Sequence, residues 1–577
     1  MNSALMRPEC ICKKSRGNRM KQEQKVPWWK RAVAYQIYPR SFLDTNGDGV
    51  GDLRGIIKKL DYLSYLGIDL IWICPIYDSA NDDNGYDIRD YEKIQAEYGT
   101  MEDFDELLCK AHEKGIRIIM DLVINHTSDE HAWFIESKSA KDSKKRDWYI
   151  WKDGKTIEKS GEMVQKEPNN WESIFGKSAW KYDETTGQYF LHVFSEKMPD
   201  INWECKEAKE EVFRMVNWWL DKGIDGFRID AISHIKKNDF TDMPNPKHLD
   251  YVSSFDKHMN QPGIQDLLQE LKEKTFEGRD VFTIAEASGV SFNEMSEWIS
   301  TREGKFSSIF QFEHQHLWSD VEDEAFDLRK LKQVLSKWQE AVKEDGWIAL
   351  FLENHDLVRC VNRFGNTASY WNESAKALAL MYFMQKGIPF IYQGQEIGMV
   401  NADYESPYDF NDTPSIFAYE NRVEHGMGKS RSFKILKQTT RDNSRTPMQW
   451  DETKNAGFST GNPWMKVNRN YASINVKSQI GKEDSILEFY RKMIHLKKSS
   501  NALLYGDYKL VMENSRDIFA YERSLCDETY FICTNLSENL VKLSDEYVFT
   551  DKEMILSNYK SKPERILKPY EAYVLKL

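Results

Sequence analysis

The sequence predicts an α/β protein with a parallel central sheet, and three observations support this fold class. From Ala32 onward, short apolar runs alternate with segments of helical periodicity. The apolar runs are hydrophobic on both faces, as expected for parallel strands joined by helical crossovers. Several helical segments end at a glycine that suits a helix C-terminus, namely Gly67, Gly115 and Gly223. Seven or eight such units favour a closed (β/α)8 barrel over an open sheet.

These patterns place individual elements along the chain. The predicted strands are residues 34–38, 70–73, 116–122, 226–230, 282–286, 349–353 and 389–392. The predicted helices between them include residues 53–66, 101–114 and 205–222. The barrel is therefore expected to comprise residues 20–126 and 198–498.

The alternation of strands and helices fails in three places. Residues 127–197 are rich in Trp, Lys, Asp and turn residues and are too long for a simple loop, which predicts an inserted subdomain (subdomain B) after the third strand. Residues 499–577 contain alternating segments without intervening helices, which predicts a C-terminal antiparallel β domain of the sandwich type. Residues 1–19 are polar and basic without periodicity, which predicts a disordered extension.

The composition argues against several classes of function. A formal net charge of −13 and the lack of a long run of Lys and Arg argue against nucleic-acid binding. No stretch approaches the roughly 20 apolar residues that cross a bilayer, and the N-terminus lacks a run of signal-peptide length. The eight cysteines lack paired metal-ligand spacing and are expected to be free thiols. We therefore expect a cytoplasmic protein without membrane or nucleic-acid partners. A monomer is a separate expectation, since no feature of the sequence determines the oligomeric state.

Polar side chains stand at four predicted strand ends, where a barrel of this kind carries its chemistry. Arg228 and Asp230 point to the same side of their strand, so the guanidinium should keep Asp230 ionised, as a nucleophile requires. Glu286 has no adjacent cation in sequence, so a raised pKa would keep it protonated, as a general acid requires. A single strand-end Asp is more often a helix cap or a surface ion pair, but four ordered strand ends favour catalysis. The four segments are residues 121–126, 226–230, 283–286 and 353–356.

These four segments resemble the four signature regions of the α-amylase superfamily, glycoside hydrolase family 13. Two further motifs, YQIYPRSF at residues 35–42 and RDNSRTPMQW at residues 441–450, resemble its oligo-1,6-glucosidase and α-glucosidase branch. The likeness runs from about Val26 to the C-terminus. It implies a retaining, exo-acting α-glucosidase that removes terminal non-reducing glucose from short oligosaccharides by double displacement, without an organic cofactor.

The resemblance also implies roles for the polar residues at the strand ends. Asp230 would be the nucleophile and Glu286 the acid/base, which retaining chemistry places about 5–5.5 Å apart. Asp356 would be the third carboxylate, which distorts the sugar and stabilises the oxocarbenium-like transition state. His126 and His355 would donate hydrogen bonds to the same glucose.

The resemblance further implies a closed end to the site. Tyr86 and Asp87 look like the pair that forms the pocket floor, with Tyr86 stacking on the terminal sugar and Asp87 binding its hydroxyls. Arg441 looks like the partner of Asp87. A charged pair there would block the far end and make the enzyme exo-acting, whereas a purely structural ion pair would leave the cleft open and the enzyme endo-acting.

The segment from Asp44 to Asp52 places oxygen side chains at alternating positions among glycines, a pattern that suits a hard cation. The position that would hold the bidentate Glu of a true EF-hand is Gly55, so an EF-hand is rejected. The resemblance implies a structural Ca2+ or Mg2+ here, and the alternative is a loop of Asx-turns without an ion. The implied ligands are Asp44, Asn46, Asp48, Asp52 and the Val50 carbonyl.

Three positions depart from the usual pattern of the branch. Met198 stands where Gln is common, which removes one polar contact, and Leu357 also stands where Gln is common. Ala231 follows the nucleophile, where Val accompanies a preference for α-1,6 links and Thr a preference for α-1,4 links. Because Ala is small and the rest of the chain resembles oligo-1,6-glucosidases, we expect isomaltose-type substrates, with a maltase-type enzyme as the alternative.

Two rival functions share the fold. A sucrose isomerase or transglucosylase differs in what attacks the glucosyl intermediate, but residues 325–330 do not match the Arg-rich loop of such isomerases well. A non-catalytic barrel scaffold of the kind found in amino-acid transporter heavy chains would need a transmembrane anchor and would not need to keep the three carboxylates.

Overall fold

The computed structural model describes residues 26–159, 162–317, 326–549, 551–561 and 564–577, and its centre is a sheet of eight parallel strands. The strands follow one another in cyclic sequence order, and the first and last strands of the sheet, β15 and β16, lie in contact. The predicted barrel is therefore confirmed. Its strands are β1 (Ala34–Ile37), β2 (Leu70–Ile73), β5 (Arg117–Val123), β12 (Gly226–Asp230), β14 (Phe282–Glu286), β15 (Ser308–Phe310), β16 (Ala349–Leu350) and β17 (Ile388–Tyr392).

The sequence missed one strand and overestimated another. β15 was not predicted because it has only 3 residues, too few to show any periodicity. β16 ends at Leu350, short of the predicted 349–353, because the chain leaves the sheet at Phe351. The residues beyond it still carry Asp356 into the mouth of the barrel.

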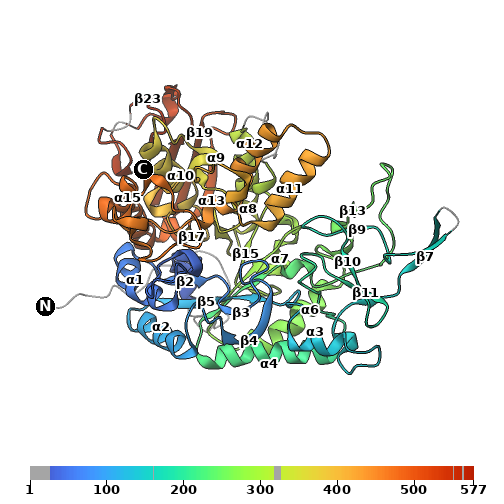
Figure 1. Ribbon diagram of the computed structural model, residues 1–577. Helices are drawn as coiled ribbons and strands as arrows, with labels where there is room; N and C mark the ends of the chain where they lie inside the picture. The colour runs from blue at the N-terminus through green and yellow to red at the C-terminus, as the bar shows by residue number, and fades with distance from the viewer. Residues whose placement is uncertain (1–25, 160–161, 318–325, 550, 562–563) are drawn as a thin grey trace, which may run out of the picture.

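Helices connect consecutive strands and cover the outside of the barrel (Figure 1). In the first of them, Asp52 accepts a hydrogen bond from the Gly55 N–H at the N-terminus, and Gly67, with φ 95°, ends the helix. These helices are α1 (Leu53–Leu66), α2 (Met101–Glu113), α4 (Lys206–Lys222), α6 (Ile264–Leu271), α7 (Met295–Ile299), α8 (Leu328–Ala341), α9 (Cys360–Phe364) and α10 (Trp371–Phe383).

The interior of the barrel is a packed core. Trp72, Phe310 and Phe390 belong to one buried cluster contributed by inward-facing strand residues. Because these rings fill the barrel, polar chemistry is confined to its mouth. The hairpin of β3 (Tyr77–Ser79) and β4 (Ile88–Ile94), which follows β2, brings Tyr86 and Asp87 to that mouth.

An inserted subdomain follows β5, as predicted, and lies to the right of the barrel in Figure 1, where its hairpin of β7 and β8 projects furthest. β9 pairs with β13 (Val252–Ser253) of the loop after β12, which ties the subdomain to the chain that leaves the strand of Asp230. The limits 127–197 stay a prediction. The elements are α3 (Ala132–Ser137), β6 (Trp151–Lys152), β7 (Lys155–Lys159), β8 (Glu162–Lys166), β9 (Trp171–Glu172), β10 (Trp180–Asp183) and β11 (Gln188–Leu191).

The short helix α5 (Phe255–His258) lies in the loop after β12. Six α-helices separate β17 from the C-terminal domain. Of these six, α11 and α12 form a helical pair beside the barrel mouth, seen at the upper right of Figure 1. The helices are α11 (Thr413–Glu424), α12 (Lys429–Thr439), α13 (Asp442–Arg445), α14 (Val476–Gln479), α15 (Ile486–Ser499) and α16 (Asn501–Tyr505).

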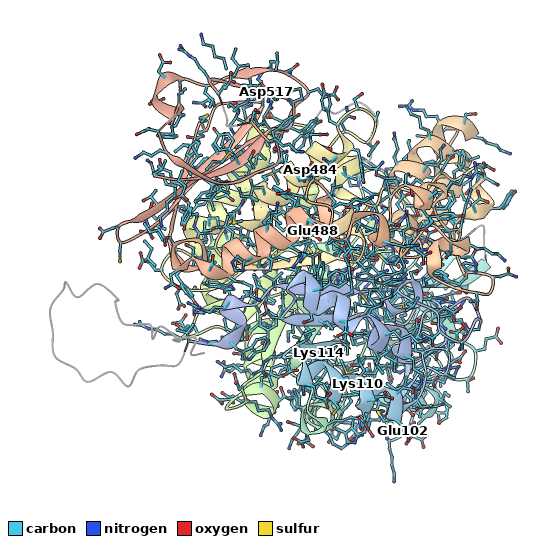
Figure 2. All side chains as sticks on the ribbon, turned by 90° about the vertical axis from the view of Figure 1, so that its left-hand side faces the viewer. Glu102, Lys110, Lys114, Asp484, Glu488 and Asp517 are labelled. Atoms are coloured by element: carbon cyan, nitrogen blue, oxygen red, sulfur yellow. The ribbon has the colours of Figure 1, made fainter. Side chains whose placement is uncertain are left out.

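The C-terminal domain is antiparallel, as predicted. Its main sheet has five strands, and a second sheet has two. Figure 2 shows Asp517 of this domain above Glu488 of α15, and Glu102, Lys110 and Lys114 of the α2 segment at the opposite end of the same face. The strands are β18 (Asp507–Val511), β19 (Ile518–Leu525), β20 (Glu528–Asn535), β21 (Val541–Lys542), β22 (Glu553–Ser557), β23 (Ile566–Leu567) and β24 (Ala572–Lys576).

Residues 1–19, predicted to be disordered, lie outside the described residues. Within the described ranges, no helix combines the length and the apolar character that a membrane span requires.

Candidate active site

One guanidinium joins three carboxyl groups at the barrel mouth. Nη1 of Arg228 lies 2.7 Å from Oδ1 of Asp121 and 2.7 Å from Oδ1 of Asp230. Its Nη2 lies 2.7 Å from Oε2 of Glu286. Strand register explains this convergence, since Arg228 on β12 is aligned with Asp121 on β5 and with Ile284 on β14, two residues before Glu286. The structure thus brings the predicted nucleophile and acid/base together.

The backbone after the nucleophile also contacts the acid/base. Ala231 has φ 44° and ψ 29°, a left-handed conformation that residues with a β-carbon seldom adopt. In this conformation its N–H donates to Oε2 of Glu286 over 2.9 Å. Ala231 therefore helps to fix Glu286 through its main chain, in addition to the small side chain on which the sequence argument rested.

The charge assignment made from the sequence needs correction. Burial raises the pKa of Asp230 well above its ordinary value, Glu286 and Asp121 add to the rise, and Arg228 opposes it. The sequence argument had Arg228 keeping Asp230 ionised and Glu286 free of any cation. The strands instead bring Arg228 to both groups, so one positive charge is divided among three carboxyl groups. For Asp230, burial outweighs the pull of Arg228 and favours the protonated form.

Asp121 was inside a predicted signature segment but had no assigned role. Burial raises its pKa to about 6, against the pull of Arg228. Its Oδ2 accepts hydrogen bonds from Nε1 of Trp72 and the hydroxyl of Tyr86, each over 3.1 Å. Asp121 therefore holds Arg228 in place through one carboxylate oxygen and binds Tyr86 through the other.

Asp356 lies in a different electrostatic setting. Its Oδ1 lies 3.0 Å from Nη1 of Arg441 and 2.8 Å from Nη2 of Arg445. Burial acts to raise the pKa of Asp356, but His355 and the two guanidiniums hold it well below its usual range. The third carboxylate is therefore ionised, as its predicted role requires.

His355 and Tyr86 form a stacked pair beside Asp356. Their rings are 5.4 Å apart with an interplanar angle of 6°, and Nε2 of His355 lies 2.7 Å from the Tyr86 hydroxyl. Nδ1 of His355 lies 2.8 Å from Nε2 of Gln36 on β1. Burial lowers the pKa of His355 to about 3, so the ring is neutral and serves as a hydrogen-bonding group.

His126 and Asp87 lie on the other side of Tyr86. His126 Nε2 donates to the Tyr86 carbonyl over 3.2 Å, and burial lowers the pKa of this histidine to about 3. Burial raises the pKa of Asp87 to about 6. Oδ1 of Asp87 accepts from Ser79 and from the Asp83 N–H, whereas its buried Oδ2 has no hydrogen-bond partner among the described residues. An acceptor without a partner at this position suits a sugar hydroxyl.

The predicted partnership of Asp87 with Arg441 is wrong. Arg441 contacts Asp83 at 3.2 Å and Asp412 at 2.6 Å, together with Asp356. Asp83, four residues before Asp87, is the carboxylate that reaches the guanidinium, while its backbone N–H supports Asp87. An ion pair with Arg441 is therefore present at this end of the site, but its acidic partner is Asp83 and not Asp87.

The sequence missed several side chains of the site. Arg445 stands four residues after Arg441, so helical spacing could have placed both on one face of the segment. Phe175 of the inserted subdomain lies under the Arg441 guanidinium at 5.7 Å, and Phe194 lies 5.2 Å from His126. No local pattern marks these rings, because aromatic residues are ordinary core material and only the folded insert brings them to the barrel.

In the loop from Asp44 to Asp52, three of the predicted cation ligands accept backbone N–H groups. Asp44 accepts the Gly47 N–H over 2.7 Å, Asp48 accepts the Val50 N–H over 2.8 Å, and Asp52 accepts the Thr45 N–H over 2.7 Å. In the described residues, no group of three or more His, Cys, Asp or Glu side chains has metal-binding geometry. The donor set of carboxylates, an amide and a carbonyl is nevertheless one that a hard cation prefers.

This arrangement defines a class of enzyme. Two carboxyl groups that share one guanidinium, with an ionised third carboxylate beside them at a barrel mouth, suit the attack of one carboxylate on an anomeric carbon while the other protonates the leaving oxygen. The site is therefore that of a glycoside hydrolase. Residues 36–506 match the family model of the alpha-amylase catalytic domain. The chain belongs to the α-amylase family of glycoside hydrolases.

Named relatives and solved structures agree with this family. The chain is 50% identical over 558 residues to the probable oligo-1,6-glucosidase 3 of Bacillus subtilis (95% of this chain, 99% of the relative). It is 46% identical over 562 residues to the oligo-1,6-glucosidase of Bacillus cereus (95% and 99%). Among solved structures, it is similar to isomaltulose synthase of Erwinia rhapontici (TM-score 0.89, 39% identity, 96% and 100% covered). It is also similar to trehalose-6-phosphate hydrolase of Bacillus licheniformis (TM-score 0.87, 40% identity, 95% and 99% covered).

Proposed function

We propose that the protein is a retaining, exo-acting α-glucosidase that releases terminal non-reducing glucose from short oligosaccharides and prefers α-1,6 links. The observation that carries this proposal is the shared contact of Asp230 and Glu286 with Arg228. Asp230 would attack the anomeric carbon as a carboxylate while Glu286 protonates the leaving oxygen. Water would then hydrolyse the glucosyl-enzyme with Glu286 as base, and Asp356 would stabilise positive charge on the sugar.

Exo action is supported by the closed end at Arg441. Phe175 packs on this guanidinium, and the next residue, Gly176, is so close to Phe417 of α11 that an added β-carbon would lie 2.1 Å from the ring. The Lys177 ammonium lies 5.2 Å from the centre of the same ring. Subdomain B and α11 therefore meet beside this end of the site, which supports a site that ends at the terminal sugar.

The preference for α-1,6 links rests on two observations. Two relatives at 50% and 46% identity are named oligo-1,6-glucosidases. The small side chain of Ala231 leaves space for the leaving sugar.

The test is hydrolysis of isomaltose, maltose and sucrose in parallel. We expect kcat/KM to be highest for isomaltose, and NMR of the first glucose released should show the α-anomer. A large preference for maltose would establish the maltase-type alternative. Isomaltulose or trehalulose formed from sucrose would establish an isomerase, and the β-anomer would refute double displacement.

We also propose that the loop from Asp44 to Asp52 holds a structural Ca2+ or Mg2+ that stiffens it without touching substrate. Asp44, Asn46, Asp48, Asp52 and the Val50 carbonyl would be its ligands. Chelator should lower the melting temperature, and metal analysis should find about one ion per chain. A metal-free protein with an unchanged melting curve would refute this site.

The protein is further proposed to act as a cytoplasmic monomer. Support for the compartment comes from the cysteines, since the six in the described residues are all free thiols, as expected in a reducing environment. Cys10 and Cys12 lie outside the described residues. Light scattering of the purified protein tests the monomer directly.

A further inference from the structure

A fourth carboxylate, Asp412, lies behind the two guanidiniums that hold Asp356. It is 1% exposed and stands immediately before α11. Its Oδ1 lies 2.8 Å from Nε and 2.6 Å from Nη2 of Arg441. The same oxygen lies 3.6 Å from Nη1 of Arg445. One carboxylate oxygen therefore faces both guanidiniums.

The local position of Asp412 suggests a different role from the one it has. An Asp directly before a helix usually accepts the backbone N–H of the second or third helical residue. Asp412 makes no such cap. Its second oxygen instead accepts the hydroxyl of Ser415, one turn into α11. One oxygen of the carboxylate thus holds a side chain of α11, and the other faces the two guanidiniums of the site.

The two guanidiniums present one edge to Asp412 and another to Asp356. Arg441 contacts Asp412 through Nε and Nη2 and contacts Asp356 through Nη1. Arg445 contacts Asp412 through Nη1 and Asp356 through Nη2. Because a guanidinium is planar and rigid, fixing one edge fixes the direction of the other.

We propose that Asp412 is a positioning residue, which orients Arg441 and Arg445 so that Asp356 faces the reacting sugar. It also balances the second positive charge at this end of the site. Without it, two guanidiniums would face Asp356 and Asp83 alone. This inference rests on the proposed function, in which Asp356 stabilises a transition state with positive charge on the sugar ring.

The proposal predicts a selective effect on cationic ligands. Asp412→Asn keeps the shape of the side chain, removes its charge and loosens the edge that Arg441 presents to Asp356. A protonated imino sugar such as 1-deoxynojirimycin resembles the charged transition state, whereas glucose resembles the neutral ground state. We expect the Kd of deoxynojirimycin to rise about tenfold or more and that of glucose by less than about threefold.

The experiment is calorimetry of both ligands with the wild type and with Asp412→Asn, together with kcat and KM on p-nitrophenyl α-glucoside. The matched control is Asp409→Asn, three residues earlier, where the carboxylate accepts the Glu405 and Ser406 N–H groups. The control should leave the ratio of the two Kd values unchanged. Asp412→Asn should lower kcat with little change in KM. A partly unfolded sample would also lower kcat at constant KM, so the ratio of the two Kd values, which does not depend on the folded fraction, is the deciding measurement.

Ser415→Ala provides a second variant in case Asp412→Asn does not fold. It removes the hydrogen bond that holds Asp412 and should shift the same ratio in the same direction by a few-fold. If Asp412→Asn folds, an unchanged ratio of the two Kd values in both variants would overturn the proposal. If it does not fold, an unchanged ratio in Ser415→Ala would overturn it. Binding is measured without turnover, so a wild type that fails to hydrolyse isomaltose would refute the proposed function and leave this test standing.

Discussion

Buried cations are satisfied in two different ways in two regions of this molecule. At the barrel mouth, the buried Arg228 and the partly buried Arg441 each contact three carboxyl groups. Where the barrel meets the C-terminal sheet, the buried cations are Lys332, Lys497 and Arg523, and they donate to main-chain carbonyls. None of these three forms an ion pair with a carboxylate in the part of the chain that the structure describes.

The carbonyl contacts join elements that are distant in sequence. Lys332 of α8 donates to the carbonyls of Met512, Ser515 and Ile518 in the C-terminal domain, over 2.9, 2.8 and 3.0 Å. Lys497 of α15 donates to the carbonyls of Phe383 and Gln385, at the end of α10, over 2.8 and 2.5 Å. The C-terminal sheet thus sits on the barrel helices, as Figure 1 shows, through directional contacts that carry no opposing charge.

The two kinds of acceptor suit two different roles, namely the packing of the C-terminal sheet on the barrel and catalysis at the barrel mouth. Carbonyl acceptors cannot change their protonation, so the contact between barrel and sheet keeps the same set of charges during the reaction. Carboxyl groups that share a guanidinium can exchange a proton and respond to charge on a ligand. We therefore expect changes at the barrel mouth to act mainly on catalysis and changes at the sheet contact to act mainly on stability.

The largest effect is expected for Asp230→Asn. Without a carboxylate to attack the anomeric carbon, kcat on isomaltose should fall by a factor on the order of 10⁴ or more. The melting temperature should hold or rise. The raised pKa of Asp230 means that its ionised form lowers stability at neutral pH, and Asn removes that cost.

The control for this variant is Asp225→Asn at the opposite end of the same strand. Asp225 is buried and pairs with Arg117 and His112, both at 2.7 Å. Its loss should lower the melting temperature and leave kcat within about twofold. Equal losses of kcat in the two variants would mean that the mouth of the barrel has no special role.

Glu286→Gln should have a smaller effect that depends on the substrate. Isomaltose needs a proton on its leaving oxygen, so kcat/KM should fall by about 10²- to 10⁴-fold. p-Nitrophenolate leaves without protonation, so p-nitrophenyl α-glucoside should lose far less in the step that forms the glucosyl-enzyme. Comparing pre-steady-state bursts on the aryl glucoside with steady-state rates on isomaltose checks this. A uniform loss on both substrates would count against Glu286 as the acid.

The sequence predicted most of the barrel and the place of Asp230, Glu286 and Asp356 at its mouth because both are local patterns. Apolar runs reveal strands, and carboxylates at their ends mark the mouth. The sequence could not predict the partners of charges, because these depend on which strands become neighbours. Arg228 was paired with Asp230 two residues away, but its contact with Glu286 crosses from β12 to β14. Asp412 and Phe175 come from separate insertions, and no spacing in the sequence connects them to Arg441.

Buried histidines provide a third test, because burial lowers the pKa of several of them at the site and in the inserted subdomain. Burial lowers the pKa of His192 to about 4 and that of His126, His131, His234 and His355 to about 3. Each would be charged below about 6.5 in the unfolded chain, which then binds more protons than the folded one. Stability is therefore fully present above about pH 6.5. It falls as the pH drops, by about 1.4 kcal/mol per unit for each histidine.

Melting curves between pH 7.5 and 5.0 measure this slope. His131→Asn keeps an acceptor for the Trp133 N–H at the start of α3 and removes one titrating group, so it should flatten the slope. His248→Asn replaces an exposed histidine and should leave the slope unchanged. Asp87 and Asp121, whose pKa burial raises to about 6, act in the opposite direction below about pH 6, so the comparison of the variants decides. Equal slopes in His131→Asn and the wild type would contradict the burial of a neutral imidazole at His131.

The smallest effect is expected for Lys497→Met at the sheet contact. Burial, together with the charge of Arg523, lowers the pKa of Lys497 well below its ordinary value, so this side chain is costly to keep charged. Methionine removes that cost and also two hydrogen bonds, each worth about 1 kcal/mol. These terms oppose each other. We expect a melting temperature within about 3 °C of the wild type and an unchanged kcat.

The pH dependence of the difference in melting temperature between the wild type and Lys497→Met is a sharper test. In the unfolded chain, a lysine loses its proton near pH 10.4. In the folded protein, a lysine with a lowered pKa loses its proton at a lower pH, so there is a pH window in which only the unfolded chain is protonated. In that window the unfolded state binds more protons, so the wild type gains stability as the pH rises, and Lys497→Met does not. Melting curves from pH 7 to 10 should show the difference moving in favour of the wild type. Lys492→Met, on the same helix but exposed and paired with Glu483, should show no such change. A difference independent of pH would mean that Lys497 stays charged, and that carbonyls alone can satisfy a buried cation as fully as carboxylates do at the barrel mouth.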